Sequence, residues 1–318
     1  MTSASSNHTR ENPASVSRLM KLEALTARST LWFLRRFRPD TSSNIGGRLC
    51  AGIGPLLPVS KVADTNLRLA MPELDDTERK RIIRGVWDNL GRTVGEFPHI
   101  ASLKENTPEG PGFEVTGKEH LLTAARSNGP VLFVSGHIGN WEMLPPGVAR
   151  YGAGFASFYR AAANPLVDRM IRDLRDAAMP DPLPLFAKGA RGARDALKWV
   201  ATGHRLGMLV DQKMNDGIET RFFNRPAMTA PALAAMALKF RCTVIPGYVQ
   251  RLGPARLRIV VEPPMPLLDT GNRQNDVATL TQAINDRLEA WIRARPESWL
   301  WLHRRWSKEL YGTSNQFK

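Results

Sequence analysis

Short apolar runs alternate with amphipathic stretches along most of the chain. Residues 131–134 form a run of β-forming side chains that Gly-Pro opens and Ser-Gly closes, a pattern typical of a strand buried on both faces. Further strands are predicted at 113–115, 153–159, 207–211, 243–249 and 256–261, and helices at 15–37, 62–70, 76–97, 118–126, 165–175, 188–202 and 276–295. This alternation predicts an α/β fold with a mixed central sheet flanked by helices.

Three segments are predicted. Residues 1–14 are rich in Ser, Asn and Thr and are expected to be a disordered tail, 15–58 form an N-terminal helical segment, and 59–311 form a single α/β domain. The helical segment carries Lys21, Arg28 and Arg35 on one stripe, with apolar residues roughly opposite. A basic amphipathic helix of this kind suits an anionic membrane surface. The alternative is a helix packed on the domain with a solvated basic face.

Charge and cysteine content narrow the class of protein. The 318 residues include 44 Lys and Arg against 30 Asp and Glu, a formal net charge of +14, which indicates an anionic partner such as nucleic acid, an anionic membrane, a phosphorylated lipid or an acidic carrier protein. Cys50 and Cys242 are too few and too far apart for a disulfide framework or a zinc site. No secretory h-region precedes residue 17, and no run approaches the ~18 apolar residues of a spanning helix, so any membrane contact is expected to be peripheral.

The exit of the 131–134 strand carries the candidate chemistry. His137 follows the strand directly, and side chains at the carboxyl ends of strands in open α/β sheets are placed for reaction. Glu142 lies five residues further on, about 140° around a regular helix, so the histidine is expected to precede the helix that holds the carboxylate. Glu142 would then fix one imidazole nitrogen and leave the other as a general base. The alternative is a helix-start histidine bonded to nearby backbone.

His137-Ile-Gly-Asn-Trp-Glu142 resembles the motif of histidine, four residues and Glu or Asp that marks the glycerolipid acyltransferase superfamily. Its Asn-Trp-Glu ending is similar to the bacterial lipid A late acyltransferases, the lauroyl and myristoyl transferase family. The resemblance runs from about residue 59 to 306. Further family-like stretches follow in order: 89–96, 159–160 with 164–165, 210–212, 222–226 and 299–306.

The resemblance implies an activity and a location. A fatty acyl chain would pass from acyl carrier protein to a hydroxyl of a Kdo-modified lipid A precursor, with 59–311 as the acyltransferase domain. The enzyme would lie peripherally on the cytoplasmic face of the inner membrane and would need no cofactor, no metal and no nucleic acid. Two alternatives stay open: a related transferase that acts on mannosylated phosphatidylinositol with acyl-CoA, and a non-catalytic protein that binds lipid or nucleic acid through its basic surface.

Acyl transfer from a thioester to a hydroxyl needs a base, a stabilised oxyanion and groups that bind both substrates. His137 with Glu142 would be the base, and backbone N–H groups of residues 136–140 would stabilise the oxyanion. Guanidinium groups suit capture of phosphates or sugar carboxylates. The predicted substrate-binding residues are Asn140, Arg160, Arg175, Asp211, Gln212, Phe223 and Arg225.

Several of these assignments have a structural alternative. Asp211 and Gln212 would orient Arg175 or the acceptor, or else cap a strand. The 222–226 stretch would line an acyl or acceptor groove, or simply pack. The aromatic and basic residues of 301–306 fit an interfacial lipid-binding face, or a structural cluster. Ser135 lacks the flanking glycines of a nucleophile elbow, so a serine acyl-enzyme is not expected.

Overall fold

The computed structural model describes residues 16–105 and 110–311. Seven strands form the central sheet in the order β1-β9-β8-β2-β5-β3-β4; β8 and β9 pair antiparallel, and all other neighbours pair parallel. The predicted α/β class with a mixed central sheet is confirmed. The strands are β1 (Gly112–Thr116), β2 (Val131–Ser135), β3 (Ala156–Tyr159), β4 (Leu185–Ala187), β5 (Leu206–Leu209), β8 (Thr243–Gly253) and β9 (Arg256–Val261), with β6 (Lys213–Phe222) and β7 (Arg225–Thr229) in a separate hairpin.

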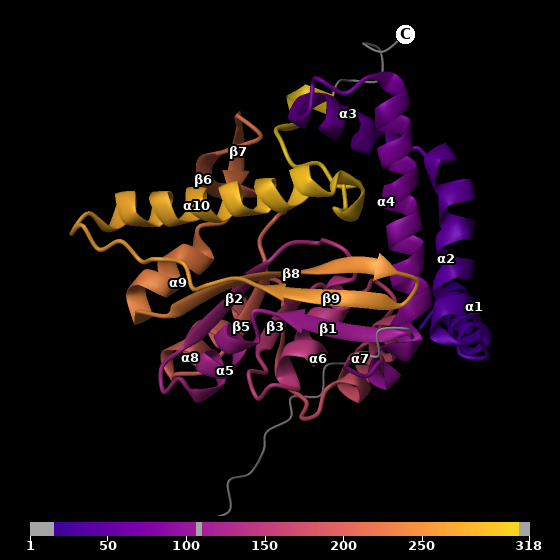
Figure 1. The fold of residues 1–318 in the computed structure, drawn as a ribbon, viewed down its shortest axis with the longest axis horizontal. Coiled ribbons are helices and arrows are strands. Elements are labelled where there is room, and N and C mark those ends of the chain that lie inside the picture. Colours follow the sequence, from indigo (N-terminus) through magenta and orange to yellow (C-terminus); the bar gives the residue numbers. More distant parts are fainter. Residues whose placement is uncertain (1–15, 106–109, 312–318) are drawn as a thin grey trace, which may run out of the picture.

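Helices cover both faces of this sheet (Figure 1). They are α1 (Arg18–Leu34), α2 (Pro39–Ile53), α3 (Ser60–Ala70), α4 (Asp76–Glu96), α5 (Lys118–Arg126), α6 (Leu144–Ala149), α7 (Pro165–Ala178), α8 (Ala190–Ala201), α9 (Ala232–Phe240) and α10 (Arg273–Ala294), with short 3-10 turns at η1 (Gly54–Leu56), η2 (Phe97–Ser102), η3 (Trp141–Met143), η4 (Pro296–Ser298) and η5 (Lys308–Tyr311). Strand β2 is buried throughout: Leu132 and Val134 enter the core beneath α10, and Val131 and Phe133 enter the core beneath α6. This two-sided burial explains its unbroken apolar sequence.

Two helix starts follow from their sequences. Ser17 caps α1 through its hydroxyl, which accepts from the backbone N–H of Met20. Asp75 and Glu78 form a capping box at the start of α4, so the predicted start near residue 76 is confirmed. The sequence analysis did not predict β4, the β6–β7 hairpin or α9. Strand β4 has only three residues, and α9 is apolar nearly all round, so neither offers a clear period.

Helix α2 of the N-terminal segment packs closely on the domain. Helix α2 lies against α4 through glycines: a Cβ added at Gly46 would overlap the carbonyl oxygen of Gly91, and one added at Gly95 would overlap that of Ser42. The predicted boundary at residue 58 falls between η1 and α3, and the predicted tail at 1–14 lies outside the described residues. Helix α2 therefore belongs to the packed core, although it precedes that boundary.

This glycine contact gives a test of the fold. We expect Gly46→Ala to lower the free energy of unfolding by about 1–3 kcal/mol, because the new methyl group meets backbone that cannot move aside. Gly52→Ala on the same helix is the matched control, since nothing lies within 4 Å of its added Cβ, and it should raise stability by up to about 1 kcal/mol. Urea unfolding followed by circular dichroism measures both. Equal effects of the two changes would mean that α2 does not approach α4 this closely.

Candidate active site

Two adjacent parallel strands position the central pair of residues, His137 and Asp211. Strands β2 and β5 lie side by side, and His137 and Asp211 follow their carboxyl ends. His137 Nδ1 lies 2.9 Å and 3.1 Å from the two carboxylate oxygens of Asp211, and the backbone N–H of His137 donates to the same carboxylate at 3.0 Å. A carboxylate only accepts, so the hydrogen of the neutral ring sits on Nδ1. The arrangement leaves Nε2 as the basic nitrogen.

The predicted hydrogen bond between His137 and Glu142 is wrong. Glu142 instead accepts from Nε and Nη2 of Arg175 at 2.9 Å and 2.7 Å, and from the indole N–H of Trp141 at 3.2 Å. Local spacing suggested Glu142, but the sheet brings a second carboxylate, Asp211, to the imidazole from the adjacent strand. Glu142 still acts on the histidine through its charge, because it contributes to the raised pKa of His137.

The electrostatics of the pair favour an ion pair when the histidine takes a proton. Burial by itself lowers the pKa of His137, but the charge of Asp211, its hydrogen bond and the charge of Glu142 outweigh burial and raise that pKa above its ordinary value. Burial likewise raises the pKa of Asp211, yet the charge and hydrogen bond of His137, with a contribution from His303, hold it well below its usual range. Asp211 therefore stays ionised and stabilises the imidazolium that forms.

Trp299 supports Asp211 from the core, and Arg305 is a second buried group, one whose charge interacts with that of Asp211. The indole N–H of Trp299 donates to Asp211 Oδ2 at 2.8 Å, and Arg305, which is 0% exposed, donates to the hydroxyl of Thr229 at 2.7 Å. Burial lowers the pKa of Arg305 to about 10, and the charge of Asp211 opposes that effect. Trp299, Trp301 and Trp306 are fully buried, so the interfacial interpretation of this stretch is wrong: these rings are core.

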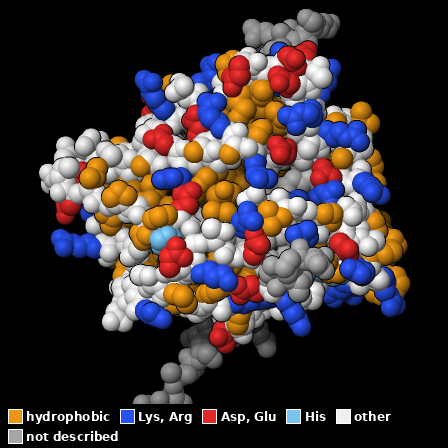
Figure 2. All heavy atoms as spheres, in the orientation of Figure 1, with side chains coloured by type: hydrophobic (Ala, Val, Ile, Leu, Met, Phe, Trp, Pro, Cys, Tyr) orange, Lys and Arg blue, Asp and Glu red, His pale blue; other side chains and the backbone are white. Residues whose placement is uncertain are grey.

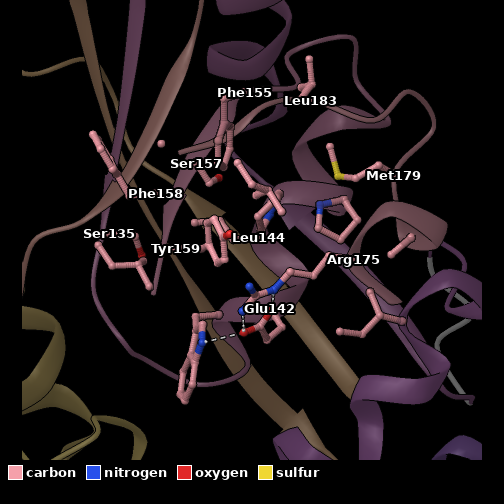
Figure 3. A pocket seen from close by; sticks show the side chains of 18 of the residues that line it. Ser135, Glu142, Leu144, Phe155, Ser157, Phe158, Tyr159, Arg175, Met179 and Leu183 are labelled. Atoms are coloured by element: carbon pink, nitrogen blue, oxygen red, sulfur yellow. Dashed lines mark hydrogen bonds and ion pairs between the residues drawn. The ribbon is translucent and has the colours of Figure 1, made fainter. Parts of the chain in front are cut away.

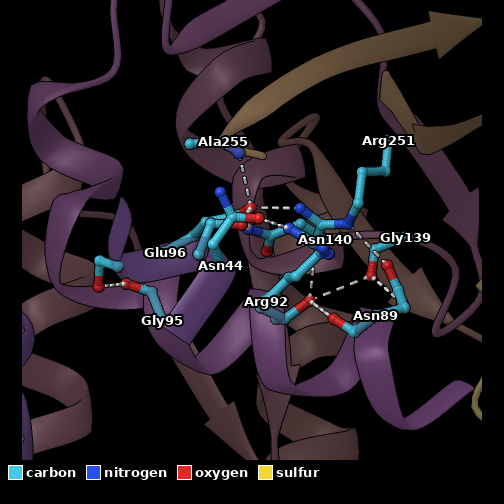
Figure 4. Close-up of polar contacts among 12 residues, drawn as sticks. Asn44, Asn89, Arg92, Gly95, Glu96, Gly139, Asn140, Arg251 and Ala255 are labelled. Carbon is cyan, nitrogen blue, oxygen red and sulfur yellow. Dashed lines mark hydrogen bonds and ion pairs between the residues drawn. The ribbon is translucent and has the colours of Figure 1, made fainter. Parts of the chain in front are cut away.

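A buried polar network holds the turn that carries His137 (Figure 4). Glu96, 0% exposed, accepts from the side-chain amide of Asn140 at 2.7 Å and from the backbone N–H of Ala255 at 2.9 Å, and it pairs with Arg251. Asn89 donates to the carbonyl of Gly139 at 3.0 Å. The structure thus makes Asn140 a support of the turn, whereas the sequence had placed it on the substrate.

Most backbone N–H groups of this turn are already hydrogen-bonded, so the turn offers little stabilisation to an oxyanion. The backbone N–H of His137 donates to Asp211, that of Ile138 to the carbonyl of Gly136, and that of Gly139 to the carbonyl of Ser298. Three of the donors that the sequence assigned to the oxyanion are therefore already engaged.

An apolar cavity of about 280 Å³ opens beside His137 (Figure 3). Strands β2, β3 and β5 form one wall, and α7 forms the opposite wall. Glu142 and Arg175 meet at one end, and most of the remaining lining is hydrocarbon: Phe97, Ile100, Phe133, Leu144, Phe155, Leu174, Ala178, Met179, Leu183 and Leu185 are among its members. A narrow apolar cavity with a few convergent polar groups suits a linear alkyl chain with a reactive head.

The structure separates the predicted substrate-binding residues into two groups. Arg160 and Arg175 line the cavity, Arg160 directly after β3 and Arg175 on α7. Gln212 is exposed beside Asp211 and does not line the cavity.

Phe223 and Arg225 lie elsewhere, at the turn of the β6–β7 hairpin. Phe223 is 2% exposed and packs on Trp301 and Trp306, and Arg225 donates to the carbonyl of Leu69 at 2.6 Å. This stretch therefore packs, the structural alternative. Neither the Glu142–Arg175 pair nor the aromatic lining is predicted from the sequence. One signal for the lining is the placement of Phe133 and Ser135 on one face of β2, with His137 after the end of that strand.

Comparison with known proteins gives a consistent family. The family model described as bacterial lipid A biosynthesis acyltransferase matches residues 23–308. The lipid A biosynthesis myristoyltransferase of Escherichia coli is 26% identical over 251 residues, 74% of this chain and 72% of the relative, and the lauroyltransferase of the same organism is 24% identical over 285 residues, 85% and 88%. A phosphatidylinositol mannoside acyltransferase of Mycobacterium tuberculosis is 27% identical over 199 residues, 62% of this chain and 60% of the relative.

The His137–Asp211 contact makes a prediction about protonation. Removal of a negative neighbour takes away what opposes burial, so Asp211→Asn should lower the pKa of His137, and Glu142→Gln should lower it by less, because Asp211 is the nearer and stronger partner. Titration of the histidine ring by NMR measures both. Asp195→Asn, on the exposed face of α8, is the control and should leave that pKa unchanged. A larger effect from Glu142→Gln would restore the pairing expected from the sequence.

Proposed function

The chain belongs to the bacterial lipid A biosynthesis acyltransferase family, and from that premise we propose that it transfers a fatty acyl chain from a thioester to a hydroxyl group of a glycolipid, with His137 as the general base. The observation that carries this proposal is the position of His137. Its Nδ1 is held by Asp211, and its ring lines the polar end of an apolar cavity that suits an acyl chain.

The reaction would proceed by direct attack. His137 Nε2 removes the proton from the acceptor hydroxyl as that oxygen bonds to the thioester carbonyl carbon, which gives a tetrahedral oxyanion. The carbon–sulfur bond then breaks, and the imidazolium returns the proton to the departing thiolate. Asp211 stabilises the imidazolium between these two steps and keeps the ring in the tautomer that the reaction needs.

Arg175 is proposed to stabilise the oxyanion. Glu142 accepts hydrogen bonds from Nε and Nη2 of Arg175, which fixes the plane of the guanidinium. Within the described residues, Nη1 of Arg175 makes no hydrogen bond. Both residues line the cavity with His137. The charge of Arg175 is thus held near the reacting carbonyl, where a preorganised donor acts more strongly than in water. In this scheme Glu142 positions Arg175 and has no direct part in proton transfer.

We further propose that the donor is acyl carrier protein and the acceptor a Kdo-modified lipid A precursor. Support comes from the family and from the Escherichia coli relatives, whose names specify lipid A biosynthesis. The Mycobacterium tuberculosis relative favours a second candidate, in which acyl-CoA serves a mannosylated phosphatidylinositol. Arg160, exposed at the edge of the cavity, would bind an anionic group of either acceptor.

The proposed location is the cytoplasmic face of the inner membrane, with peripheral attachment. Within the described part of the chain, no helix has the length and hydropathy needed to cross a bilayer. Helices α1 and α2 with η1 instead expose large apolar side chains, among them Leu56 at 83%, Leu19 at 65% and Trp32 at 59%, beside exposed Lys21, Arg28 and Arg35. Figure 2 shows apolar and basic side chains along the margin where Figure 1 places these helices. Such a mixed surface suits an anionic lipid interface.

Acyl transfer by the purified protein tests the proposed reaction. We expect His137→Ala to lower kcat by about 10²- to 10⁴-fold with the fold intact, since the base is lost. Ser135→Ala, which alters the same cavity two residues earlier, should leave the rate nearly unchanged because no serine ester forms. Offering acyl carrier protein or coenzyme A thioesters with each acceptor distinguishes the two candidates. Turnover by His137→Ala would reject the mechanism, and failure of every donor and acceptor pair would favour the non-catalytic binding alternative.

Vesicle cosedimentation tests the membrane surface. The double change Trp32→Glu and Leu56→Glu should reduce binding to anionic vesicles by about 10-fold or more, because it places two charges where apolar side chains meet lipid. Leu197→Glu on α8 changes an exposed leucine elsewhere and should not weaken binding. If both proteins bind as the wild type does, the membrane surface lies elsewhere.

A further inference from the structure

An aromatic wall closes the inner end of the cavity. Phe133 and Phe155 are 5% and 4% exposed, and their ring centroids lie 4.8 Å apart. In Figure 3, Phe155 and Leu183 lie at the end of the cavity opposite Glu142 and Arg175. An alkyl chain whose carbonyl group lies beside His137 would therefore point its methyl end at this wall.

A glycine fixes the position of the wall. Gly207 on β5 pairs with Phe133 on β2 and with Ser157 on β3. A Cβ added at Gly207 would overlap the ring of Phe155, so that ring lies directly over the glycine backbone. Leu183 also lines this end of the cavity, and its Cδ1 lies 3.0 Å from where a Cβ at Gly154 would be. The ring therefore fills a space that any side chain at position 207 would occupy.

The depth of the cavity is set by the strands. Phe133 lies two residues before Ser135, about 7 Å along the strand at about 3.3 Å per residue, and His137 follows two residues after the strand ends. Ser135 lines the cavity between Phe133 and His137, and Ser157 lines it level with Phe133, since Ser157 and Phe133 both pair with Gly207. These small side chains leave the cavity open up to the phenylalanines.

We propose that Phe155, held over Gly207 and backed by Phe133, sets the longest acyl chain that the site accepts. The inference rests on the proposed function, since it takes the cavity to hold the acyl chain of the donor. Protein interiors are close-packed, so a chain that reaches past the wall must displace a buried ring. One methylene too many in an apolar pocket is discriminated against by about 10-fold or more.

Two variants move the limit in opposite directions. Phe155→Ala removes the wall and should raise the ratio of kcat/KM for hexadecanoyl over dodecanoyl pantetheine thioesters by about 10-fold or more. Ser157→Met narrows the cavity at the level of Phe133 from a half-buried position and should lower the same ratio. Val134→Ala is the control: it removes a similarly buried side chain from the opposite face of β2 and should leave the ratio unchanged. Ser157→Met keeps the test informative if Phe155→Ala fails to fold.

Equilibrium binding of the corresponding free fatty acids separates this proposal from the proposed function. If neither the wild type nor any variant transfers acyl groups but the ratio of binding constants shifts as expected, the proposed function is rejected and the role of Phe155 in limiting chain length is supported. If transfer occurs and neither variant changes the preference, the wall is rejected and the function stands. A shift with Val134→Ala as large as with Phe155→Ala would also reject the wall, because it would show a general loosening of the core. If no protein transfers acyl groups and no fatty acid binds in this cavity, both proposals are rejected.

Discussion

The hydrogen bond between His137 and Asp211 is the contact on which the rest of the site depends. It joins the exits of two adjacent parallel strands, so its length is fixed by the pairing of β2 with β5 and not by a flexible loop. A fully buried carboxylate is costly unless it is paired. Here the imidazole of His137, its backbone N–H and the indole N–H of Trp299 all hydrogen-bond to the carboxylate of Asp211. The site is therefore a product of the sheet, and it can form only when β2, β5 and the C-terminal aromatic cluster have packed.

The sequence predicted most elements and the location of the chemistry, but not the partners within it. The strand at 131–134, the helix at 118–126 and the strand at 256–261 have short, strong patterns bounded by turns, and the structure confirms them. The spacing of residues along the chain does not show which side chains meet across neighbouring strands. Glu142 is five residues from His137 and Asp211 is on another strand, yet Asp211 makes the hydrogen bond. For this reason the carboxylate was assigned to the wrong residue.

The family-like stretches carry different roles once the fold is known. The 89–96 stretch and the 299–306 stretch contain no residue that lines the cavity, yet Asn89 and Glu96 hold the turn after β2 and Trp299 holds Asp211. The 222–226 stretch fills the core around the same tryptophans. A family-like motif can thus hold the residues of the site in place without lining the cavity itself. Arginines show the same division: Arg175 reaches the cavity, and Arg225 and Arg305 bind backbone and hydroxyl groups.

The exposed helices and the cavity are mechanically connected. Asn164, at the start of α7, donates to the carbonyl of Met20 at 2.7 Å and to the carboxylate of Glu23 at 3.0 Å, both on α1. Helix α7 in turn forms one wall of the cavity and carries Arg175. A bilayer that binds the apolar side of α1 would therefore bear on the helix that holds the guanidinium beside the reacting carbonyl. The proposed membrane contact and the geometry of the proposed oxyanion site would then be linked, because α1 packs on α7 and α7 lines the cavity.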